Sequence, residues 1–344
     1  MTAARDDHEF VVVSPFARTG LTCTPDRADR IRRLAEPWLT VQPGTAAPGE
    51  WRVLTGTEPT AAARPEVVAA SGEVPVRYAV DEAARLLFHL LPDGEDWRVQ
   101  SALRATRAIH RSAASRAGDL FLHAGLLEVN GTGILLAGGS RAGKTTFIMT
   151  TVLGGTGRMI SNDDSSLYAS ADGSVTGTGW PRSVSVRLDT LDVLFGRDRA
   201  TELLAGLSHP ANATLPGLRE SGVEPHGTAL FYPWEYARLL GTEIGKRAGV
   251  GAVVHLGLAD DDEESHLAEV PLPERAALLD RQLLALPNKH LNIFGHEPAA
   301  GTTDRARLAL KSLPTYRFRY RFREVRQEVD RLTSFLSTRP SVTS

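Results

Sequence analysis

Cysteine and lysine are scarce in this chain of 344 residues. The single cysteine, Cys23, excludes an internal disulfide framework and is typical of proteins from a reducing compartment. Of the 39 basic side chains only four are lysines, namely Lys144, Lys246, Lys289 and Lys311. Because lysine and arginine bind anions in different ways, each lysine in so arginine-rich a chain requires its own explanation.

A large net charge and long apolar runs are missing as well. The formal net charge of -2 gives no general attraction for nucleic acids or membrane surfaces. No stretch approaches the ~18 consecutive apolar residues of a membrane-spanning helix. The first residues, MTAARDDHEF, are acidic and contain no apolar signal core. We therefore expect a cytoplasmic globular protein with neither a nucleic-acid nor a membrane partner.

The first 118 residues predict a smaller α+β region. Its strand-like segments are 10–13, 51–54 and 74–80, and its helix-like segments are 26–38, 81–91 and 96–118. Residues 42–64 are rich in proline, glycine, alanine and threonine, which predicts a loop or a linker. We interpret residues 1–118 as an accessory or substrate-recognition part.

From residue 119 the pattern changes to short strands separated by tight turns, which predicts an α/β part over residues 119–344. The strand-like segments are 120–129, 133–137, 158–161, 165–170, 174–179, 183–188, 251–258 and 316–323. The helix-like segments are 144–153, 189–195, 234–249 and 273–286.

The segment GGSRAGKTTF, residues 138–147, carries the strongest functional signal. It has the P-loop spacing G-x-x-x-x-G-K-[ST] and lies between an apolar strand and a helix. Glycines let backbone N–H groups turn toward phosphate oxygens, and the N-terminus of the helix adds positive potential. The predicted nucleotide-binding residues are Gly138, Gly139, Ser140, Arg141, Ala142, Gly143, Lys144, Thr145 and Thr146. In such loops the lysine binds the β- and γ-phosphates and the next hydroxyl binds Mg²⁺, which are the roles of Lys144 and Thr145.

Two adjacent aspartates follow the next strand-like segment. Asn162, Asp163 and Asp164 come directly after residues 158–161. In a parallel sheet the carboxyl end of a strand faces the ligand crevice. A carboxylate there can bind Mg²⁺ or accept the proton of an attacking hydroxyl. Taken alone, the pair is equally compatible with an acidic turn between two strands.

The order of these features resembles the kinase domain of HPr kinase/phosphorylase and its divergent relatives. That family has a histidine at the start of a strand, a Gly-x-Gly turn, an apolar strand, the P-loop, a helix, and a strand that ends in acidic residues. The corresponding residues here are His123, Gly131–Gly133, Gly138–Thr146 and Asn162–Asp164, within residues 121–195. The closer similarity is to HPr-kinase-like proteins of peptide natural-product pathways.

This resemblance implies a P-loop kinase domain of the HPr kinase and phosphoenolpyruvate carboxykinase type, with a mixed sheet. It implies ATP and Mg²⁺ as ligands, and a peptide or small protein as the partner that receives the phosphate. Relatives form oligomers, so a homo-oligomer is compatible with the resemblance.

The resemblance also implies roles for individual residues. Asp163 would be the general base, and Asp164 a metal ligand or structural partner. His123 would be a catalytic-site group that senses or steadies the phosphates; the alternative is a hydrogen-bonded histidine at a strand edge. Ser174 and Thr176 stand where the family has a glutamate and an arginine.

Arginine is the other residue type expected near a migrating phosphoryl group. Arg141 lies within the loop, and Arg182 and Arg187 flank a strand-like segment. Residues 316–323 alternate between aromatics and arginines, which predicts a strand with an aromatic core face. That strand is interpreted as a sheet edge, or alternatively as a docking surface for an acidic peptide or a phosphate.

The nucleotide base is predicted to be adenine. Residues 287–290, PNKH, are similar to part of a guanine-reading Asn-Lys-x-Asp, but Leu291 stands in the place of the aspartate. The sequence thus predicts an ATP-dependent kinase that acts on a Ser or Thr hydroxyl. A small-molecule kinase and an ATP-binding regulator without phosphate transfer are the alternatives.

Overall fold

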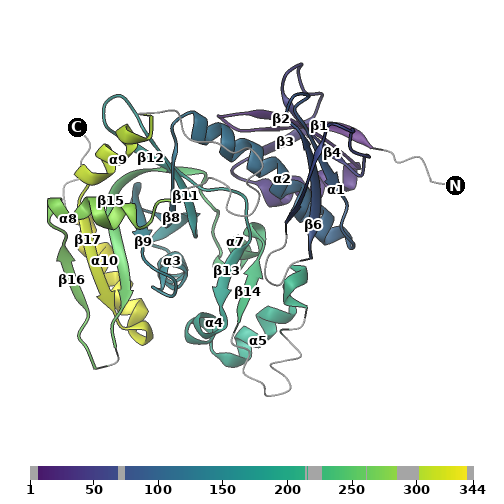
Figure 1. Ribbon diagram of the computed structural model, residues 1–344. Coiled ribbons are helices and arrows are strands. Elements are labelled where there is room, and N and C mark those ends of the chain that lie inside the picture. Colours follow the sequence, from purple (N-terminus) through teal and green to yellow (C-terminus); the bar gives the residue numbers. More distant parts are fainter. Residues whose placement is uncertain are drawn as a thin grey trace.

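The computed structural model describes residues 7–68, 74–213, 215, 227–260, 262–284 and 302–338. The PNKH segment at 287–290 lies outside these residues. Over these residues the protein is of the mixed α/β type, with a seven-stranded sheet, an eight-stranded sheet and a two-stranded sheet (Figure 1). In the described part, no helix is both long enough and apolar enough to cross a membrane.

The seven-stranded sheet is built from the N-terminal part of the chain. Its elements are β1 (His8–Val13), β2 (Arg18–Cys23), α1 (Pro25–Ala35), β3 (Thr40–Pro43), β4 (Trp51–Thr55), β5 (Arg64–Val68), β6 (Val76–Asp81), β7 (Leu86–Leu90) and α2 (Glu95–Arg116). The strand order is β3-β1-β2-β4-β7-β6-β5, with β2, β4 and β7 parallel to one another. Helices α1 and α2 pack on this sheet and share its hydrophobic core.

The predicted helix at 81–91 is wrong, because this segment forms a turn and strand β7. Asp81 Oδ1 accepts a hydrogen bond from the Ala84 amide at 3.0 Å, and Arg85 has a φ of 54°, which closes a tight turn. The following strand lies between β4 and β6 and is almost entirely buried. A strand buried on both faces has a continuous apolar sequence, which periodicity cannot distinguish from a helix.

The eight-stranded sheet and its helices follow. The elements are β8 (Leu120–Val129), β9 (Thr132–Ala137), α3 (Lys144–Leu153), β10 (Gly157–Ser161), β11 (Asp164–Ala169), β12 (Val175–Thr178), β13 (Val184–Arg187), α4 (Leu188–Phe195), α5 (Arg197–Ala205), η1 (Pro210–Asn212), β14 (Thr228–Phe231), α7 (Pro233–Leu240), β15 (Arg247–Leu258), β16 (His266–Glu269), α8 (Leu272–Asp280), α9 (Thr302–Ser312), β17 (Thr315–Tyr320), η2 (Phe322–Glu324) and α10 (Val325–Ser337). Strands β13 and β14 form the separate two-stranded sheet.

The sheet is mixed, and the strand before the acidic pair is not paired in parallel as expected. Strand β10 pairs antiparallel with β8, and β9 pairs antiparallel with the same β8. Because both run against β8, they point the same way, and β15 and β17 follow β9 in parallel. The carboxyl ends of these four strands therefore meet at one edge of the sheet, where open α/β sheets bind their ligands.

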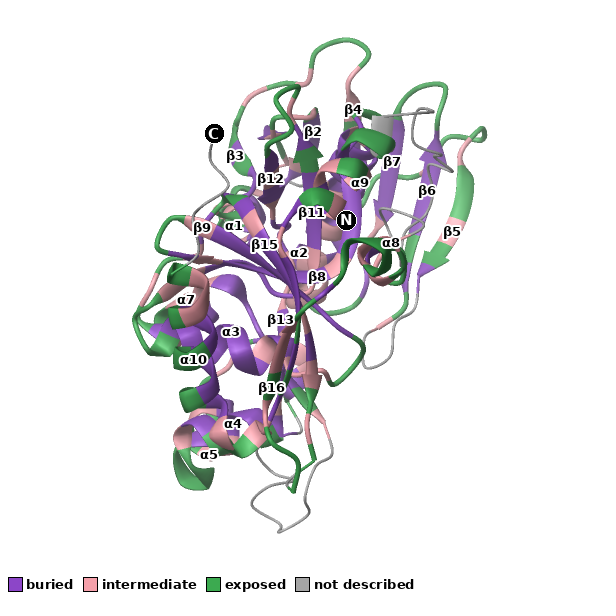
Figure 2. Cartoon of the chain, turned by 90° about the vertical axis from the view of Figure 1, so that its left-hand side faces the viewer, coloured by how far each residue is buried: buried purple, intermediate pink, exposed green. Residues whose placement is uncertain are grey.

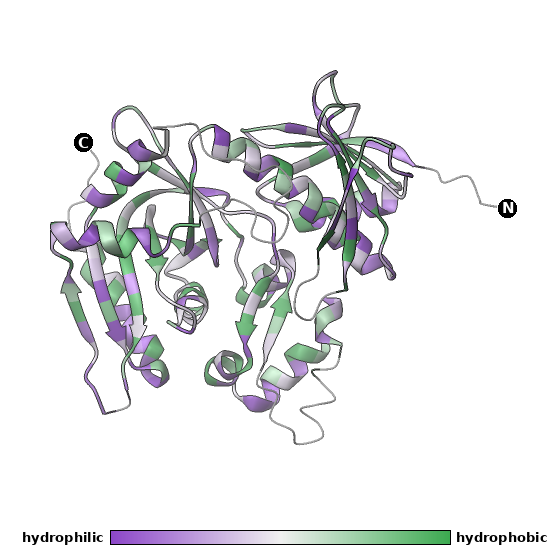
Figure 3. Ribbon diagram, in the orientation of Figure 1, coloured by the Kyte–Doolittle hydropathy of each residue, from purple (hydrophilic) through white to green (hydrophobic). Residues whose placement is uncertain are grey.

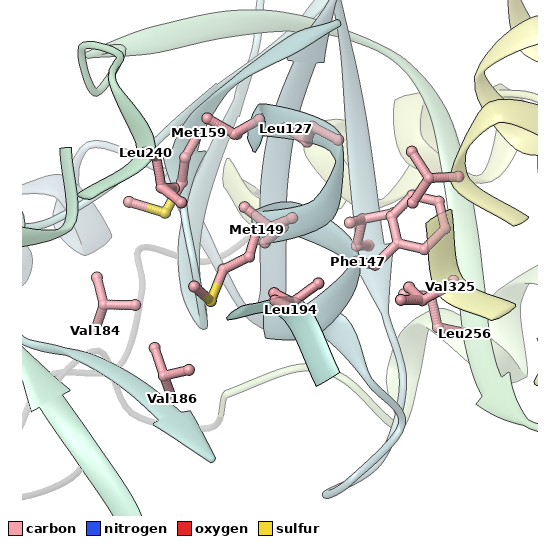
Figure 4. Packing of buried hydrophobic residues seen from close by; sticks show 14 of the residues in the cluster. Leu127, Phe147, Met149, Met159, Val184, Val186, Leu194, Leu240, Leu256 and Val325 are labelled. Carbon is pink, nitrogen blue, oxygen red and sulfur yellow. The ribbon is translucent and has the colours of Figure 1, made fainter. Parts of the chain in front are cut away.

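Helices cover both faces of this sheet. On one face α3 and α10 pack against each other and against the strands, with α4 and α7 beside them; Figure 4 shows Phe147 and Met149 of α3 among these apolar side chains. On the other face α8 and α9 supply Leu279, Ala306 and Leu310 to a second cluster. The strands between are mostly buried (Figure 2), and α9 carries hydrophilic and hydrophobic bands (Figure 3), as expected of a helix with one solvent face.

The alternation in the C-terminal aromatic–arginine strand is confirmed, but the strand is not at the sheet edge. Tyr316, Phe318 and Tyr320 are buried, whereas Arg317 and Arg319 are exposed. Strand β17 lies between β15 and β16, so β16 covers its outer side. Phe322 lies beyond the strand in η2.

Two predicted helices end earlier than expected. Helix α7 stops at Leu240, because Gly241 adopts a left-handed φ of 64° that terminates it. Helix α8 stops at Asp280. In α7, Gly241 therefore ends the helix and is not one of its interior residues.

The two parts of the chain contact each other through buried side chains. Phe121, Trp180 and Tyr232 belong to the same hydrophobic cluster as the N-terminal sheet. Trp38 Nε1 donates a hydrogen bond to the Ile160 carbonyl at 3.2 Å. The division of the chain near residue 119 stays a prediction, and α2 is the element that joins the two sheets (Figure 1).

Asp119, in the buried connection from α2 to β8, offers a test of this packing. Burial raises the pKa of its carboxyl group to about 6, although a hydrogen bond with Ser166 opposes the rise. The unfolded chain titrates near 3.9. Between these values the folded protein holds a proton that the unfolded chain has lost, so stability falls as the pH rises from about 4 to about 6.

We expect Asp119→Asn to remove this loss. The variant should have a free energy of unfolding about 3 kcal/mol higher than the parent at pH 8, and a far smaller gain at pH 4. Urea titrations of both proteins at the two pH values measure the difference. An equal difference at pH 4 and pH 8 would contradict the assignment of a raised pKa.

Candidate active site

The glycine-rich loop connects β9 to α3 at the ligand-binding edge of the sheet. Gly138 has a φ of 149°, Arg141 a φ of 65° and Gly143 a φ of 84°. Such values favour glycine, and a glycine-rich turn of this kind can direct backbone N–H groups toward an anion. Helix α3 begins at Lys144, directly after this turn. The local geometry is that of an anion-binding loop followed by a helix N-terminus.

At two glycines of the loop, Gly138 and Gly143, an added side chain would collide with neighbouring atoms. A Cβ at Gly138 would lie 2.7 Å from the Leu256 carbonyl oxygen and 2.8 Å from the Ala142 Cβ. A Cβ at Gly143 would overlap the hydroxyl group of Tyr320. That hydroxyl donates a hydrogen bond to the Gly143 carbonyl at 3.1 Å and ties the loop to the end of β17. These positions fit a loop that requires glycine for its close packing.

Lys144 curls back over the loop. Its Nζ donates hydrogen bonds to the carbonyl oxygens of Gly138 at 2.9 Å and Gly139 at 3.2 Å. Burial lowers the pKa of Lys144, and the nearby charge of Asp163 opposes this shift. The amine is therefore a buried cation within electrostatic reach of the acidic pair.

The other loop residues differ in exposure. Gly139, Ser140 and Arg141 are exposed, whereas Ala142 and Thr145 are partly buried. The Thr146 hydroxyl is buried and shares a hydrogen bond of 2.8 Å with the Thr190 hydroxyl of α4. Thr146 thus anchors α3, and Thr145 is the hydroxyl of this pair that remains accessible.

The sheet register brings the acidic pair to the predicted histidine. Asp164 is the first residue of β11 and lies opposite His123 of β8. Opposed residues of an antiparallel pair project their side chains from the same face. His123 Nε2 and Asp163 Oδ1 lie 2.9 Å apart. The structure therefore places three of the predicted site residues together: His123, Asp163 and Asp164.

Arginines from two other segments complete this cluster. Arg182 Nη1 lies 2.6 Å from Asp164 Oδ2 and 3.4 Å from Asp163 Oδ2, so it bridges the two carboxylates. Arg111 Nη1 of α2 lies 3.7 Å from Asp164 Oδ2. The Arg111 guanidinium also covers the rings of Phe121 at 4.7 Å and Trp180 at 5.6 Å. Such cation–π contacts fix the orientation of a buried arginine.

Both carboxylates are held in the ionised form. Burial alone would raise the pKa of Asp163, but the hydrogen bond from His123 and the charges of Arg182 and Lys144 hold that pKa well below its usual range. Burial also opposes ionisation of Asp164, whose pKa is nevertheless lowered by Arg182 and then Arg111. The acidic pair is thus a charged network, not a solvated turn.

A cavity of about 190 Å³ adjoins this network. Asp163, Asp164 and His123 form one wall, and a face of α2 forms another. Arg182 and neighbouring residues between β12 and β13 line it as well. No residue of the glycine-rich loop is among the described residues that line it. The acidic pair therefore borders the cavity, while the Asp163 charge also acts on Lys144 of the loop.

The sequence did not reveal the arginines of α2 as site residues. Arg104, Arg107 and Arg111 line the cavity. Their spacing of three and four positions places them on one stripe of the helix, which is the signal that was present in the sequence. That signal lay within an amphipathic pattern, so it was indistinguishable from a charged solvent face until the tertiary structure placed it against the acidic pair.

The arginines that the sequence analysis singled out differ in whether they line the cavity. Arg182 lines the cavity, whereas Arg187 forms a 2.8 Å ion pair with Asp189 and does not line it. Arg317 and Arg319 pair with glutamates on the outer face of β17. The interpretation of β17 as a docking surface therefore has no link to the cluster of His123 and the aspartates.

The described residues include no group of three or more histidine, cysteine, aspartate or glutamate side chains that could hold a metal ion without other ligands. The donor set nevertheless fits Mg²⁺ shared with phosphates, which prefers one or two protein oxygens plus phosphate oxygens and water. Thr145 and the acidic pair supply oxygen donors of this kind. Asp164 already contacts two arginines, and its predicted role as a metal ligand stays a prediction.

Comparisons with known proteins give little beyond this geometry. No protein-family model matches the chain, and no curated protein matches it. Among solved structures, the chain is similar to the HPr(Ser) kinase/phosphatase from Coxiella burnetii, with 10% sequence identity and a TM-score of 0.29. The alignment covers 63% of this chain and 95% of that chain.

If the loop binds a nucleotide as the sequence predicts, the glycine geometry indicates which substitutions weaken that binding. We expect Gly138→Ala and Gly143→Ala to weaken binding of Mg²⁺–ATP at least about 10-fold. The added Cβ would displace the neighbouring atoms, and an alanine disfavours the positive φ of these positions. Isothermal titration calorimetry measures the affinity.

Gly139→Ala is the matched control, since a Cβ at that position meets nothing within 4 Å. It should bind the nucleotide within about two-fold of the parent. Equal losses in all three variants, each shown to be folded by circular dichroism, would mean that the close packing at Gly138 and Gly143 does not determine binding.

Proposed function

We propose that this protein is an ATP-dependent kinase that transfers the γ-phosphate of ATP to a serine or threonine hydroxyl of a peptide or small protein. The observation that carries the proposal is the position of Asp163. It is close enough to Lys144 for each charge to shift the pKa of the other, and it also lines the cavity beneath α2. In this proposal Asp163 serves both ligands, because its charge acts on the lysine of the loop and it lines the cavity that would receive the hydroxyl.

The loop would bind the triphosphate. Backbone N–H groups between Gly138 and Gly143 and the N-terminus of α3 favour anionic phosphate oxygens. Lys144 is the cation of the loop, and it would exchange its carbonyl contacts for the β- and γ-phosphates. Mg²⁺ would neutralise charge on these phosphates when bound, with Thr145 and an aspartate of the pair as its protein ligands.

Asp163 would orient the acceptor hydroxyl. Because its pKa is lowered, the carboxylate is ionised at neutral pH and accepts the hydrogen bond of that hydroxyl. As the bond from the hydroxyl oxygen to phosphorus forms and the bond to the leaving ADP oxygen breaks, the hydroxyl proton passes to Asp163. His123 and Arg182 hold the carboxylate in place, each through its own oxygen atom.

Asp164 would support this arrangement from behind. Its contacts with Arg182 and Arg111 fix the guanidinium that also reaches Asp163. An arginine beside the migrating phosphoryl group suits a transition state whose charge is spread over the equatorial oxygens.

The size of the cavity bears on the acceptor. At about 190 Å³ it is smaller than the roughly 300–1,000 Å³ of most small-molecule sites. It suits the insertion of one side chain or the end of a chain better than the enclosure of a whole metabolite. This observation favours a peptide or protein acceptor over a free small molecule.

The kinase proposal predicts different effects for two substitutions. Asp163→Asn should lower phosphate transfer from γ-labelled ATP at least about 100-fold and leave ATP affinity within a few-fold, because it removes the proton acceptor and not the loop. Lys144→Ala should weaken both transfer and ATP affinity. Substrate arrays of peptides and small hydroxyl compounds serve as acceptors.

Asp172→Asn, on an exposed turn between β11 and β12, is the matched control and should transfer phosphate at the parent rate. Tight ATP binding by the parent with no transfer to any acceptor would indicate the ATP-binding regulator. Transfer by Asp163→Asn near the parent rate would disprove the assignment of the base.

A further inference from the structure

The two-stranded sheet of β13 and β14 forms a wall of the cavity opposite α2. Successive side chains of a strand point to opposite faces, and residues opposed in the register share a face, as Ser185 and Leu230 do. One face packs into the hydrophobic core through Val184, Val186, Ala229 and Phe231, of which Figure 4 shows the two valines. The other face lines the cavity through Ser183, Ser185 and Leu230. This small sheet therefore has one face in the core and one on the cavity.

The cavity extends along α2 for about three turns of the helix. Its described lining residues on α2 run from Gln100 to Arg111. At a rise of about 1.5 Å per residue, this stretch of helix is roughly 16 Å long. At one end Arg111 Nη1 lies 3.7 Å from Asp164 Oδ2, and at the other end Gln100 Nε2 donates a 3.0 Å hydrogen bond to the Tyr232 hydroxyl. The acidic pair and Tyr232 therefore lie at opposite ends of one cavity.

Apolar side chains from four elements meet at the Tyr232 end of the cavity. We call this group the Tyr232 subsite; it consists of Leu34 of α1, Leu103 of α2, Leu230 of β14, Tyr232, and Pro233 of α7. Helix α1 contacts α7, which brings Leu34 to this end. The Tyr232 hydroxyl is bonded to Gln100, and its ring packs against the His209 ring with centroids 5.1 Å apart. These contacts hold Tyr232 in one position, so the subsite is formed before any ligand binds.

The two ends of the cavity differ in chemistry. The end at Asp163 and Asp164 is charged, whereas the Tyr232 subsite offers apolar surface, which binds apolar side chains through the hydrophobic effect. A ligand that fills both ends must span roughly 16 Å. An extended chain rises about 3.3 Å per residue, so about four or five residues separate its two contact points. A small hydroxyl compound would reach only one of the two ends.

We propose that the Tyr232 subsite binds a large apolar side chain of the acceptor, about four or five residues from the Ser or Thr that receives the phosphate. The inference rests on the proposed kinase function and narrows its acceptor to a peptide or protein segment that binds in an extended conformation. The segment lies between α2 and the sheet of β13 and β14, with its hydroxyl at Asp163. Because α2 belongs to residues 1–118, the N-terminal part contributes to substrate recognition.

A position scan of acceptor peptides tests the inference. Each peptide has one serine in a frame of alanine and glutamine, and one leucine whose distance from the serine is varied on either side. Matched peptides have asparagine, which is similar in shape but polar, in place of the leucine. Phosphate transfer from γ-labelled ATP is measured, and fluorescence polarisation measures binding of the same peptides with alanine in place of serine.

The scan should show a maximum at one distance. On one side of the serine, we expect leucine about four or five residues away to give at least about 10-fold higher kcat/KM and tighter binding than asparagine, because the subsite removes its side chain from water. Leucine directly beside the serine should change kcat/KM less than about two-fold, because it cannot reach the subsite.

Leu230→Asn should abolish this preference by raising KM for the leucine peptide about 10-fold, with little change in ATP affinity. Leu230→Met, which keeps an apolar side chain, should retain it. Leu308→Asn is the matched control and should behave as the parent, because Leu308 is 67% exposed on α9 and is not among the described lining residues. Leu230→Asn is used only if its thermal unfolding matches the parent; otherwise the scan with the parent protein decides.

The outcomes separate the two proposals. Transfer that is equal for leucine and asparagine peptides, that is best at another distance, or that keeps its preference in a folded Leu230→Asn would overturn the subsite and leave the kinase function standing. Failure of transfer to every acceptor would overturn the function. Leucine-dependent binding at the expected distance would then still support the subsite, and equal or absent binding would overturn it. Transfer to small hydroxyl compounds alone would overturn both the peptide acceptor and the subsite.

Discussion

Arg182 is the centre of the interactions on which the site depends. Two adjacent aspartates repel each other, and burial would keep at least one of them protonated. The single guanidinium at 2.6 Å from Asp164 and 3.4 Å from Asp163 removes that conflict, with His123 and Arg111 as outer partners. Because Arg111 belongs to α2, the same network fixes the N-terminal part against the second sheet. Removing one partner of such a buried network leaves the others uncompensated.

The direction of the strands explains why the glycine-rich loop and the aspartates share one edge of the sheet. Strand β8 runs against both β9 and β10, so these two strands end on the same side although neither pairs with the other. The loop is then fixed by β17, whose Tyr320 hydroxyl binds the Gly143 carbonyl. Aromatic contacts of Tyr320 and Phe318 with Phe147 hold α3 in the same layer. The cradle and the carboxylates are thus positioned by one layer of core packing.

The predictions that the structure supports were those whose signal is local. The turn at Asn130 and Gly131 has φ values of 50° and 77°, as a two-residue hairpin turn requires, and the loop glycines adopt the conformations that their motif demands. The prediction of a helix at 81–91 failed because strand β7 is buried on both faces, so no alternation remained. The predicted end of the helix at residue 249 was wrong because Gly241, in a left-handed conformation, ends helix α7 although the apolar periodicity continues.

By itself, the sequence determined the glycine-lysine loop, the acidic pair and the alternating face of β17, because each depends on residues that are neighbours along the chain. Only the tertiary structure decided that Arg182 bridges the aspartates, that His123 contacts Asp163, and that Arg104, Arg107 and Arg111 face them across a cavity. These contacts join segments that are far apart in sequence. Their electrostatic strength comes from burial, which depends on how the helices and sheets pack and is not encoded at any single position.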